Sequence, residues 1–224
     1  MQPEQFVELL GEVRASAILR TERPEAAAPA MEAAIRGGFR IVEFTLTTPG
    51  ALDRIAEFSR RNDLVVGAGT VLTVADARAA VEGGARFLVS PVVDEDVIAA
   101  ARDLGVAVMP GTHTPTEMLR AHRAGAQLQK LFPVPGGGPA FVRACLGPLP
   151  FLRIVPTNGV DAENVAEYLD ADVHAVGFVA PVFDPGDLAE GSYDRIEERA
   201  RTILARVQGA GSARGRVSQE RKRR

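Results

Sequence analysis

The chain lacks several features that would assign it to a secreted, fibrous or membrane class. It has no tryptophan and a single cysteine, Cys145, among 224 residues. An intramolecular disulfide therefore cannot form, and a reducing compartment is expected. No apolar run approaches the roughly 18 residues of a membrane span, and glutamates interrupt the N-terminal stretch where a signal peptide has its apolar segment. These absences predict a cytoplasmic protein that has no membrane partner.

The chain also has little excess of either charge sign, except at the C-terminus. The formal net charge of −3 is too small to indicate a nucleic-acid partner. Basic residues gather among Gly, Ser and Gln in residues 209–224. This segment has the composition of a flexible basic tail, and a solvated terminus is favoured over a docking segment for an acidic partner. Residues 1–208 are expected to form one domain.

Lysine is the rarest of the common charged residues in this chain. Of 26 basic residues only Lys130 and Lys222 are lysines, and Lys222 lies in the predicted tail. An arginine cannot give up its proton and act as a nucleophile, whereas a lysine can. The one lysine inside the domain therefore indicates a role that arginine cannot fill.

Short apolar runs alternate with helical patterns along the chain, which indicates repeated βα units and a parallel sheet. Eight units in one short chain favour an α/β fold of the (β/α)8 TIM-barrel type over an open doubly wound sheet. An extra N-terminal helix over residues 2–13 is expected to cover the bottom of the barrel. Strands are predicted at residues 15–20, 41–47, 64–70, 86–90, 106–110, 127–132, 152–157 and 173–179, and helices at 24–36, 51–60, 74–82, 94–104, 115–124, 139–146, 162–169 and 193–207.

Two charged residues fall on strands and are candidates for chemistry. Residues alternate between two faces along a strand, so Glu43 lies opposite the apolar set that includes Phe44 and should point into the barrel. Lys130 shares a face with Leu128 and Phe132, and it can meet Glu43 if that face is inward. An amine beside a carboxylate suits imine chemistry, in which the lysine attacks a ketone and the carboxylate moves protons. A buried Lys–Glu pair that only holds two strands together is the alternative.

Six short runs, in order and spacing, resemble the 2-keto-3-deoxy-6-phosphogluconate (KDPG) / 4-hydroxy-2-oxoglutarate (KHG) aldolases, and the likeness covers about residues 15–204. It implies a homotrimeric class I aldolase that needs no metal or other cofactor and releases pyruvate plus glyceraldehyde 3-phosphate or glyoxylate. The runs are Val42-Glu43-Phe44-Thr45, Gly67-Ala68-Gly69-Thr70-Val71, Ser90-Pro91, Pro110-Gly111, Lys130-Leu131-Phe132-Pro133 and Pro156-Thr157-Asn158-Gly159.

The resemblance also implies roles for individual residues. Lys130 is similar to the Schiff-base lysine, Glu43 to the general acid/base, Thr70 to a ligand of the substrate carboxylate and Phe132 to a wall of the pyruvate pocket. Further substrate contacts are expected within the same runs, although the position of Thr157 is equally that of a residue ending its strand. These further residues are Pro91, Thr157, Asn158 and Gly159.

The chain departs from the family pattern at two places. Many members carry an arginine where this chain has Thr47, and Arg20 resembles the arginine of a sub-branch that lacks that residue. A guanidinium can bind a carboxylate through two hydrogen bonds, so Arg20 is favoured as the carboxylate ligand over a merely solvated strand end. The family has a glycine-rich phosphate cradle. At the corresponding positions this chain has Asn158-Gly159 and Phe178-Val179. A shorter or unphosphorylated 2-oxo acid would tolerate these bulkier residues better than a phosphorylated sugar acid.

Weaker signals leave other functions open. His113 follows the fifth predicted strand and is either a proton carrier or a residue that caps the next helix. The three histidines and the cysteine show no metal-ligand spacing. The alternatives to an aldolase are a sugar-phosphate isomerase or epimerase that uses Glu43 as a base, and a catalytically silent barrel that binds a small acid.

Overall fold

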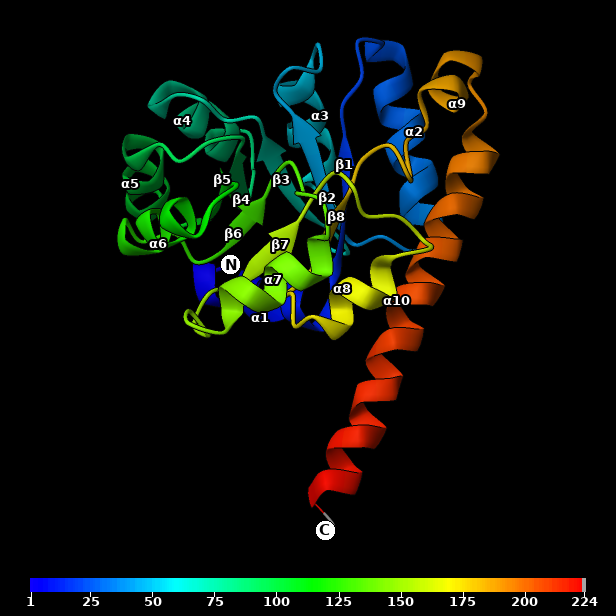
Figure 1. Cartoon of the computed structure of the whole chain (residues 1–224). Coiled ribbons are helices and arrows are strands. Elements are labelled where there is room, and N and C mark those ends of the chain that lie inside the picture. The colour runs from blue at the N-terminus through cyan, green and yellow to red at the C-terminus, as the bar shows by residue number, and fades with distance from the viewer. Residues whose placement is uncertain (223–224) are drawn as a thin grey trace.

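Eight parallel strands form the centre of the computed structural model, and helices surround them (Figure 1). The structure describes the backbone of residues 1–222 and the side chains of residues 1–210. The predicted tail, residues 209–224, lies almost entirely outside the described side chains and stays a prediction. The strands are β1 (Ala15–Leu19), β2 (Ile41–Thr45), β3 (Val65–Gly69), β4 (Phe87–Ser90), β5 (Ala107–Thr112), β6 (Gln129–Leu131), β7 (Ile154–Pro156) and β8 (Val176–Phe178).

The strands pair in sequence order around a barrel. The order runs from β7 back to β1 and then to β8, and every pairing is parallel. A bridge between Thr157 and Gly177 brings β7 to β8 and closes the ring. The predicted (β/α)8 TIM barrel is therefore confirmed.

The helices follow the predicted alternation, with bounds shifted by a few residues, except that α10 was predicted to end at residue 207 and its backbone continues to Lys222. Thr73 and Thr114 accept hydrogen bonds from the first-turn amides of Asp76 and Glu117, as expected for N-caps. Before α8 the side chain of Asp161 accepts hydrogen bonds from the amides of Glu163 and Asn164, and Asn164 is the N-cap residue. The helices are α1 (Pro3–Val13), α2 (Pro24–Arg36), α3 (Ala51–Phe58), α4 (Val74–Glu82), α5 (Glu95–Asp103), α6 (Pro115–Arg123), α7 (Gly138–Leu146), α8 (Val165–Asp170), α9 (Pro185–Glu190) and α10 (Tyr193–Lys222).

Helix α9 was not predicted. Its six residues make fewer than two turns, which is too short for a helical period to be visible in the sequence. Asp184 caps it through hydrogen bonds from the amides of Gly186 and Asp187, and Pro185 stands at its first position. The helix matters because it forms one wall of a cavity at the top of the barrel.

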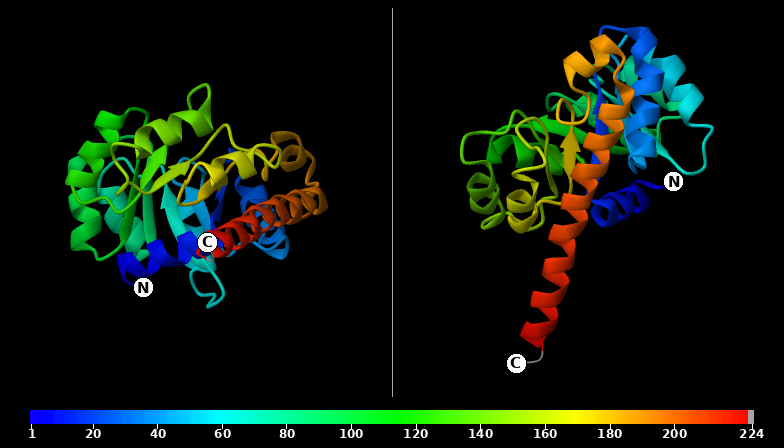
Figure 2. Two further views of the ribbon diagram at one scale, coloured as in Figure 1. Left: turned by 60° about the horizontal axis from the view of Figure 1, so that its bottom comes forward. Right: turned by 90° about the vertical axis from the view of Figure 1, so that its right-hand side faces the viewer.

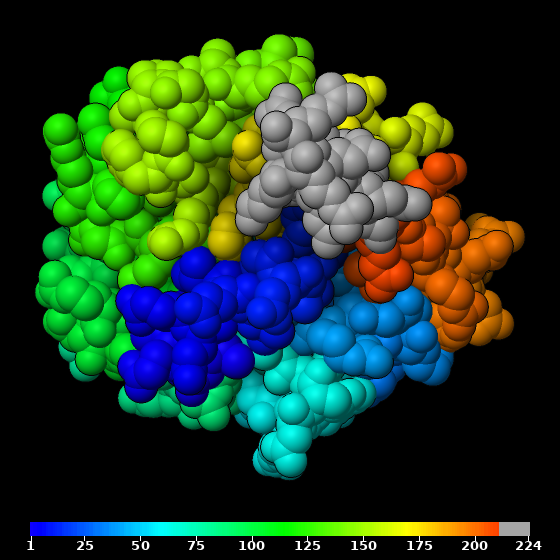
Figure 3. Space-filling view, turned by 90° about the horizontal axis from the view of Figure 1, so that it is seen from below, coloured from blue at the N-terminus to red at the C-terminus, as the bar shows by residue number. Residues whose placement is uncertain are grey.

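Apolar side chains fill the lower half of the barrel interior, and α1 covers that end (Figure 3). The rings of Phe6 and Phe87 stack with their centroids 4.4 Å apart, so α1 is packed directly into the barrel. This confirms the predicted covering helix. The interior cluster consists of Phe6, Val7, Leu10, Ile41, Val65, Phe87, Val89, Ala107, Met109, Leu128, Val155 and Ala175.

Helix α10 packs along one side of the barrel against α2 and α8 (Figure 2). An ion pair of 2.8 Å between Arg36 and Glu197 joins α2 to α10. Within the part of the chain that the structure describes, none of the helices combines the length and apolar character of a membrane span.

Candidate active site

The inward faces of β2 and β6 carry Glu43 and Lys130. Ile41 belongs to the interior cluster, so Glu43, two residues further along β2, also points inward. Leu128 belongs to the same cluster, and Lys130 follows it by two residues. Both side chains thus lie beyond the interior apolar cluster, toward the carboxyl ends of the strands. Active sites of TIM barrels lie at this end.

Lys130 is buried in an environment that favours its neutral form. Its side chain is 6% exposed, and Nζ lies 4.9 Å from the centre of the Phe132 ring. Burial lowers the pKa of the Lys130 amine, and the positive charge of Arg20 acts in the same direction. The carboxylate of Glu43 opposes both effects. The net shift increases the share of free amine, which is the nucleophilic form.

Glu43 is more deeply buried than the lysine. It is 1% exposed, and neither carboxyl oxygen has a hydrogen-bond partner among the described residues. A Cβ on Gly69 would collide with Oε1 of Glu43, so only glycine at that position leaves room for the carboxyl group. Burial raises the pKa of Glu43, against the opposing charges of Lys130 and Arg20. The protonated form of this carboxyl group is therefore favoured more than it is in a solvated glutamate.

A cavity of about 200 Å³, the lysine cavity, opens beside Lys130. It brings together five of the predicted site residues from the ends of β1, β6 and β7. Of the four others, Val179 was identified as a cradle position, whereas Ile18, Ala180 and Pro181 were missed. Ile18 shares the inward face of β1 with Arg20 and so was detectable from strand alternation. The cavity is lined by Ile18, Arg20, Lys130, Phe132, Thr157, Asn158, Val179, Ala180 and Pro181.

Arg20 and Thr70 meet at the rim of this site. Nη2 of Arg20 donates a hydrogen bond of 3.2 Å to Oγ1 of Thr70. Thr70 has a φ of 58°, an unusual conformation for a β-branched residue and one that is found at functional sites. Among the described residues, no carboxylate lies within ion-pair distance of Arg20. The guanidinium is therefore available to bind an anion.

The loop after β7 contributes an unusual pair of residues. Oγ1 of Thr157 is buried and has no hydrogen-bond partner among the described residues. Asn158 follows in the left-handed region with a φ of 66°, and its carbonyl accepts a hydrogen bond from the amide of Val134. Both residues line the lysine cavity, where Thr157 can donate to or accept from a bound molecule.

Besides Thr70, three predicted contacts do not line the lysine cavity. Thr47 is exposed and lines a neighbouring cavity, and its hydroxyl lies 3.1 Å from that of Thr45. Pro91 is half-buried, and its backbone lies against Gly111. Gly159 is exposed with a φ of 102°, and its carbonyl accepts a hydrogen bond from Asn164. Each follows a strand, but none of the three lines the cavity beside Lys130.

Two other sequence interpretations are corrected or refined. Phe178 was expected to crowd the cradle, but it is fully buried in the core, where its ring meets Phe39 edge-on at 6.3 Å. The change at the cavity itself is therefore Val179. The amide of His113 donates to the Glu117 carboxylate at 2.8 Å, and Nδ1 of His113 lies 2.8 Å from the carbonyl of Pro133. His113 thus joins two loops of the site.

A buried amine of lowered pKa and a buried acid of raised pKa share the interior of one barrel. Across the described side chains, no group of three or more His, Cys, Asp or Glu residues is placed to bind a metal ion. The fold and this pair are those expected of a barrel enzyme that works through an amine nucleophile and a proton-transferring acid.

Comparison with known proteins gives the family. Residues 7–199 match the family described as "Aldolase: KDPG and KHG aldolase". The 2-dehydro-3-deoxy-phosphogluconate aldolase of Pseudomonas aeruginosa is 36% identical over 205 residues, which cover 88% of this chain and 91% of that protein. The chain belongs to the KDPG and KHG aldolase family, and it is a carbon–carbon lyase.

Solved structures agree with this result. The KDPG aldolase of Legionella pneumophila, with pyruvate captured at low pH as a covalent carbinolamine intermediate, superposes with a TM-score of 0.78 at 27% identity and covers 86% of this chain and 97% of that one. A chain of a cube-shaped protein cage, designed by fusing symmetric oligomeric domains, superposes with a TM-score of 0.85 at 28% identity, covering 93% of this chain and 77% of that one.

Proposed function

We propose that the protein is a class I aldolase that cleaves a 4-hydroxy-2-oxo acid to pyruvate and an aldehyde, with Lys130 as the covalent nucleophile. The substrate is KDPG or 4-hydroxy-2-oxoglutarate, and the aldehyde is glyceraldehyde 3-phosphate or glyoxylate. One observation carries the proposal: a buried lysine of lowered pKa and a buried glutamate of raised pKa face the same barrel interior. Neither a structural ion pair nor a non-covalent isomerase needs the lysine in its neutral form.

The first step is imine formation. The free amine of Lys130 attacks the C2 ketone and forms a carbinolamine. The protonated carboxyl group of Glu43 donates its proton to the C2 hydroxyl, which leaves as water. The product is a cationic imine, and Glu43 is left as a carboxylate beside it.

Carbon–carbon cleavage follows. Glu43 takes the proton of the C4 hydroxyl, the C3–C4 bond breaks, and its electron pair moves to the imine to form an enamine. The aldehyde departs. Protonation of the enamine at C3 and addition of water to the resulting imine release pyruvate and restore the Lys130 amine.

The remaining site residues orient the 2-oxo acid. Arg20 and Thr70 bind the carboxylate, because the guanidinium has no carboxylate partner and already contacts the Thr70 hydroxyl. Phe132 forms a wall over Lys130, and Thr157 and Asn158 contact the substrate at the far side of the cavity. Thr47, Pro91 and Gly159 contact the substrate only where it extends past this cavity.

The assembly and compartment belong to the same proposal. The protein is a homotrimer in the cytoplasm. The family resemblance and the match to a cage built from symmetric oligomeric domains support the trimer. A single cysteine, Cys145, supports a reducing compartment.

Borohydride trapping tests the mechanism directly. The protein is incubated with pyruvate and sodium borohydride, and the added mass is located by peptide mass spectrometry. A pyruvyl adduct on Lys130 is expected, because the hydride reduces the imine to a stable amine. Lys222, the only other lysine, serves as an internal control for non-specific reaction.

The variant Lys130→Met should form no adduct and should lose aldolase activity while keeping the circular dichroism of the wild type. Absence of an adduct on the folded wild-type protein would overturn the covalent mechanism. The isomerase and the silent barrel would then be the functions to test.

A further inference from the structure

The lysine cavity is too small for a complete aldol substrate. Its volume is about 200 Å³, below the ~300 Å³ at which typical ligand pockets begin. At about 30 Å³ per water, it corresponds to roughly seven waters, which suits a pyruvyl group alone. The half of the substrate that becomes the aldehyde must therefore lie in an adjoining space.

One adjoining space, the arginine cavity, shares three walls with the lysine cavity. Arg20, Val179 and Ala180 line both. The arginine cavity has a volume of about 410 Å³ and lies between the ends of β1, β2 and β8 and helix α9. The two cavities therefore adjoin at Arg20.

The charge of the arginine cavity suits an anion. Arg20 stands at its border with the lysine cavity and is assigned to the 2-oxo acid carboxylate, so Arg23, next to Glu22, is the cation left for a second anion. Arg23 is held only by a loose pair with Glu25, at 3.9 Å between two side chains that are 54% and 69% exposed. Exposed pairs of this kind contribute little stability, so Arg23 can exchange its partner for a substrate anion. The hydroxyl of Thr47 lines the same cavity and adds a hydrogen-bonding group.

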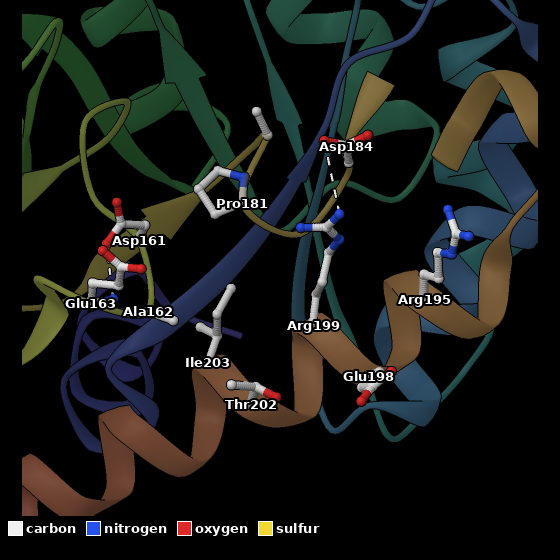
Figure 4. Close-up of a pocket in the computed structure, with 11 residues that line it drawn as sticks. Asp161, Ala162, Glu163, Pro181, Asp184, Arg195, Glu198, Arg199, Thr202 and Ile203 are labelled. Atoms are coloured by element: carbon white, nitrogen blue, oxygen red, sulfur yellow. Dashed lines mark hydrogen bonds and ion pairs between the residues drawn. The ribbon is translucent and has the colours of Figure 1, made fainter. Parts of the chain in front are cut away.

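The other adjoining space, the outer pocket, has the opposite charge. It has a volume of about 820 Å³ and meets the lysine cavity at Ala180 and Pro181. Arg199 is already paired with Asp184 and Asp187, as Figure 4 shows for Asp184. Carboxylates therefore outnumber arginines along its walls, and a substrate anion is repelled. The charged lining consists of Asp161, Glu163, Asp184, Glu198, Arg195 and Arg199.

We propose that the aldehyde-derived half of the substrate lies in the arginine cavity and that Arg23 binds an anionic group, a carboxylate or a phosphate, at its far end. The inference rests on the proposed aldolase function and assigns its second substrate. Arg23 thereby selects anionic aldehydes over neutral ones. Thr47, which does not contact the lysine cavity, gains a role as a wall of this second half-site.

The test runs the reaction in the direction of synthesis, with pyruvate and one of three aldehydes. Glyoxylate carries a carboxylate, glyceraldehyde 3-phosphate carries a phosphate, and glyceraldehyde carries no charge. In Arg23→Gln, KM for the anionic aldehyde should rise roughly 10-fold to 100-fold, the range of a lost charged hydrogen bond, with kcat little changed. The kinetics with glyceraldehyde should not change. An effect on glyoxylate indicates a carboxylate site, and an effect on glyceraldehyde 3-phosphate indicates a phosphate site.

Two further variants make the test specific. Arg102→Gln removes an equally exposed arginine from α5, outside the arginine cavity, and should behave as the wild type. Glu22→Gln removes the negative charge from the cavity and should lower KM for the same anionic aldehyde. Arg23→Gln is not expected to disturb folding, because the Arg23 side chain makes no hydrogen bond that caps α2.

Borohydride trapping separates the two possible failures. If Arg23→Gln affects charged and neutral aldehydes alike, or neither, while pyruvate is still trapped on Lys130, the arginine half-site is overturned and the aldolase function stands. If the wild type traps no pyruvate, both are overturned.

Discussion

Burial acts on Lys130 and Glu43 in opposite chemical directions. It lowers the pKa of the amine and raises the pKa of the carboxyl group, because each charged form loses hydration inside the barrel. The attraction between the two charged forms opposes both shifts, and desolvation is the larger effect in each case. The pair is thus biased toward the neutral forms that begin imine formation.

The neighbouring charges should move the pKa of Lys130 in opposite directions. Arg20 lowers this pKa, so Arg20→Met should raise it and leave less free amine at a given pH. Glu43 raises it, so Glu43→Gln should lower it further. The pH dependence of acetylation at Lys130, read by peptide mass against Lys222, measures both changes. Shifts of the same sign in the two variants would contradict this electrostatic account.

At the scale of elements, α1 is joined to the barrel by packing and by one histidine. Nε2 of His174, in the segment before β8, lies 2.9 Å from the carbonyl of Val7 on α1. Gly11 makes the approach possible, because a Cβ there would come within 2.9 Å of the imidazole ring. The sequence predicted the covering helix, but no local signal pointed to the histidine that holds it.

His174 should make stability depend on pH. Burial lowers its pKa from the usual value of about 6.5, and nearby arginines act in the same direction. The unfolded chain therefore binds more protons than the folded protein below about pH 6.5, and stability should fall as the pH drops through this range toward the folded pKa. Urea unfolding between about pH 7 and pH 5 measures the effect.

The matched variants isolate this histidine. His174→Gln should weaken the pH dependence in that range, and His122→Gln, at an exposed position on α6, serves as the matched control. Equal slopes for His174→Gln and the wild type would show that other groups cause the dependence.

At the scale of the whole molecule, barrel closure creates the site. Strands β2 and β6 are four strands apart in the order, so an open flat sheet would hold Glu43 and Lys130 roughly 19 Å apart, at ~4.8 Å per strand. The ring places them across one interior, where each charge acts on the pKa of the other. The Thr157–Gly177 bridge that closes the ring also adjoins the cavity, since Thr157 lines it.

The proposed trimer makes a prediction at this scale. Sedimentation equilibrium should give a mass three times the 23.8 kDa of one chain at micromolar concentration. The mass of Arg23→Gln should be the same, which would keep its kinetic effect separate from assembly. A monomeric mass for an active protein would contradict the trimer and leave the barrel's own chemistry in place.

Local sequence patterns were sufficient to predict most of the fold. The period-two alternation of β2 and the caps at Thr73 and Thr114 depend on neighbours in the chain, so they were visible in the sequence. Helix α9 was missed because its six residues make fewer than two turns, too few for a helical period to be visible. The scarcity of lysine and the inward face of its strand likewise singled out Lys130 without tertiary information.

The sequence by itself determined the eight βα units, the covering helix and the two residues most suited to imine chemistry, because strand alternation and residue chemistry are local properties. Only the tertiary structure decided what surrounds them. Phe178 turned into the core, Thr47 turned to the arginine cavity, and Val179 became a wall shared by two cavities. These outcomes depend on how loops from distant strands meet at the top of a closed barrel, which no local pattern encodes.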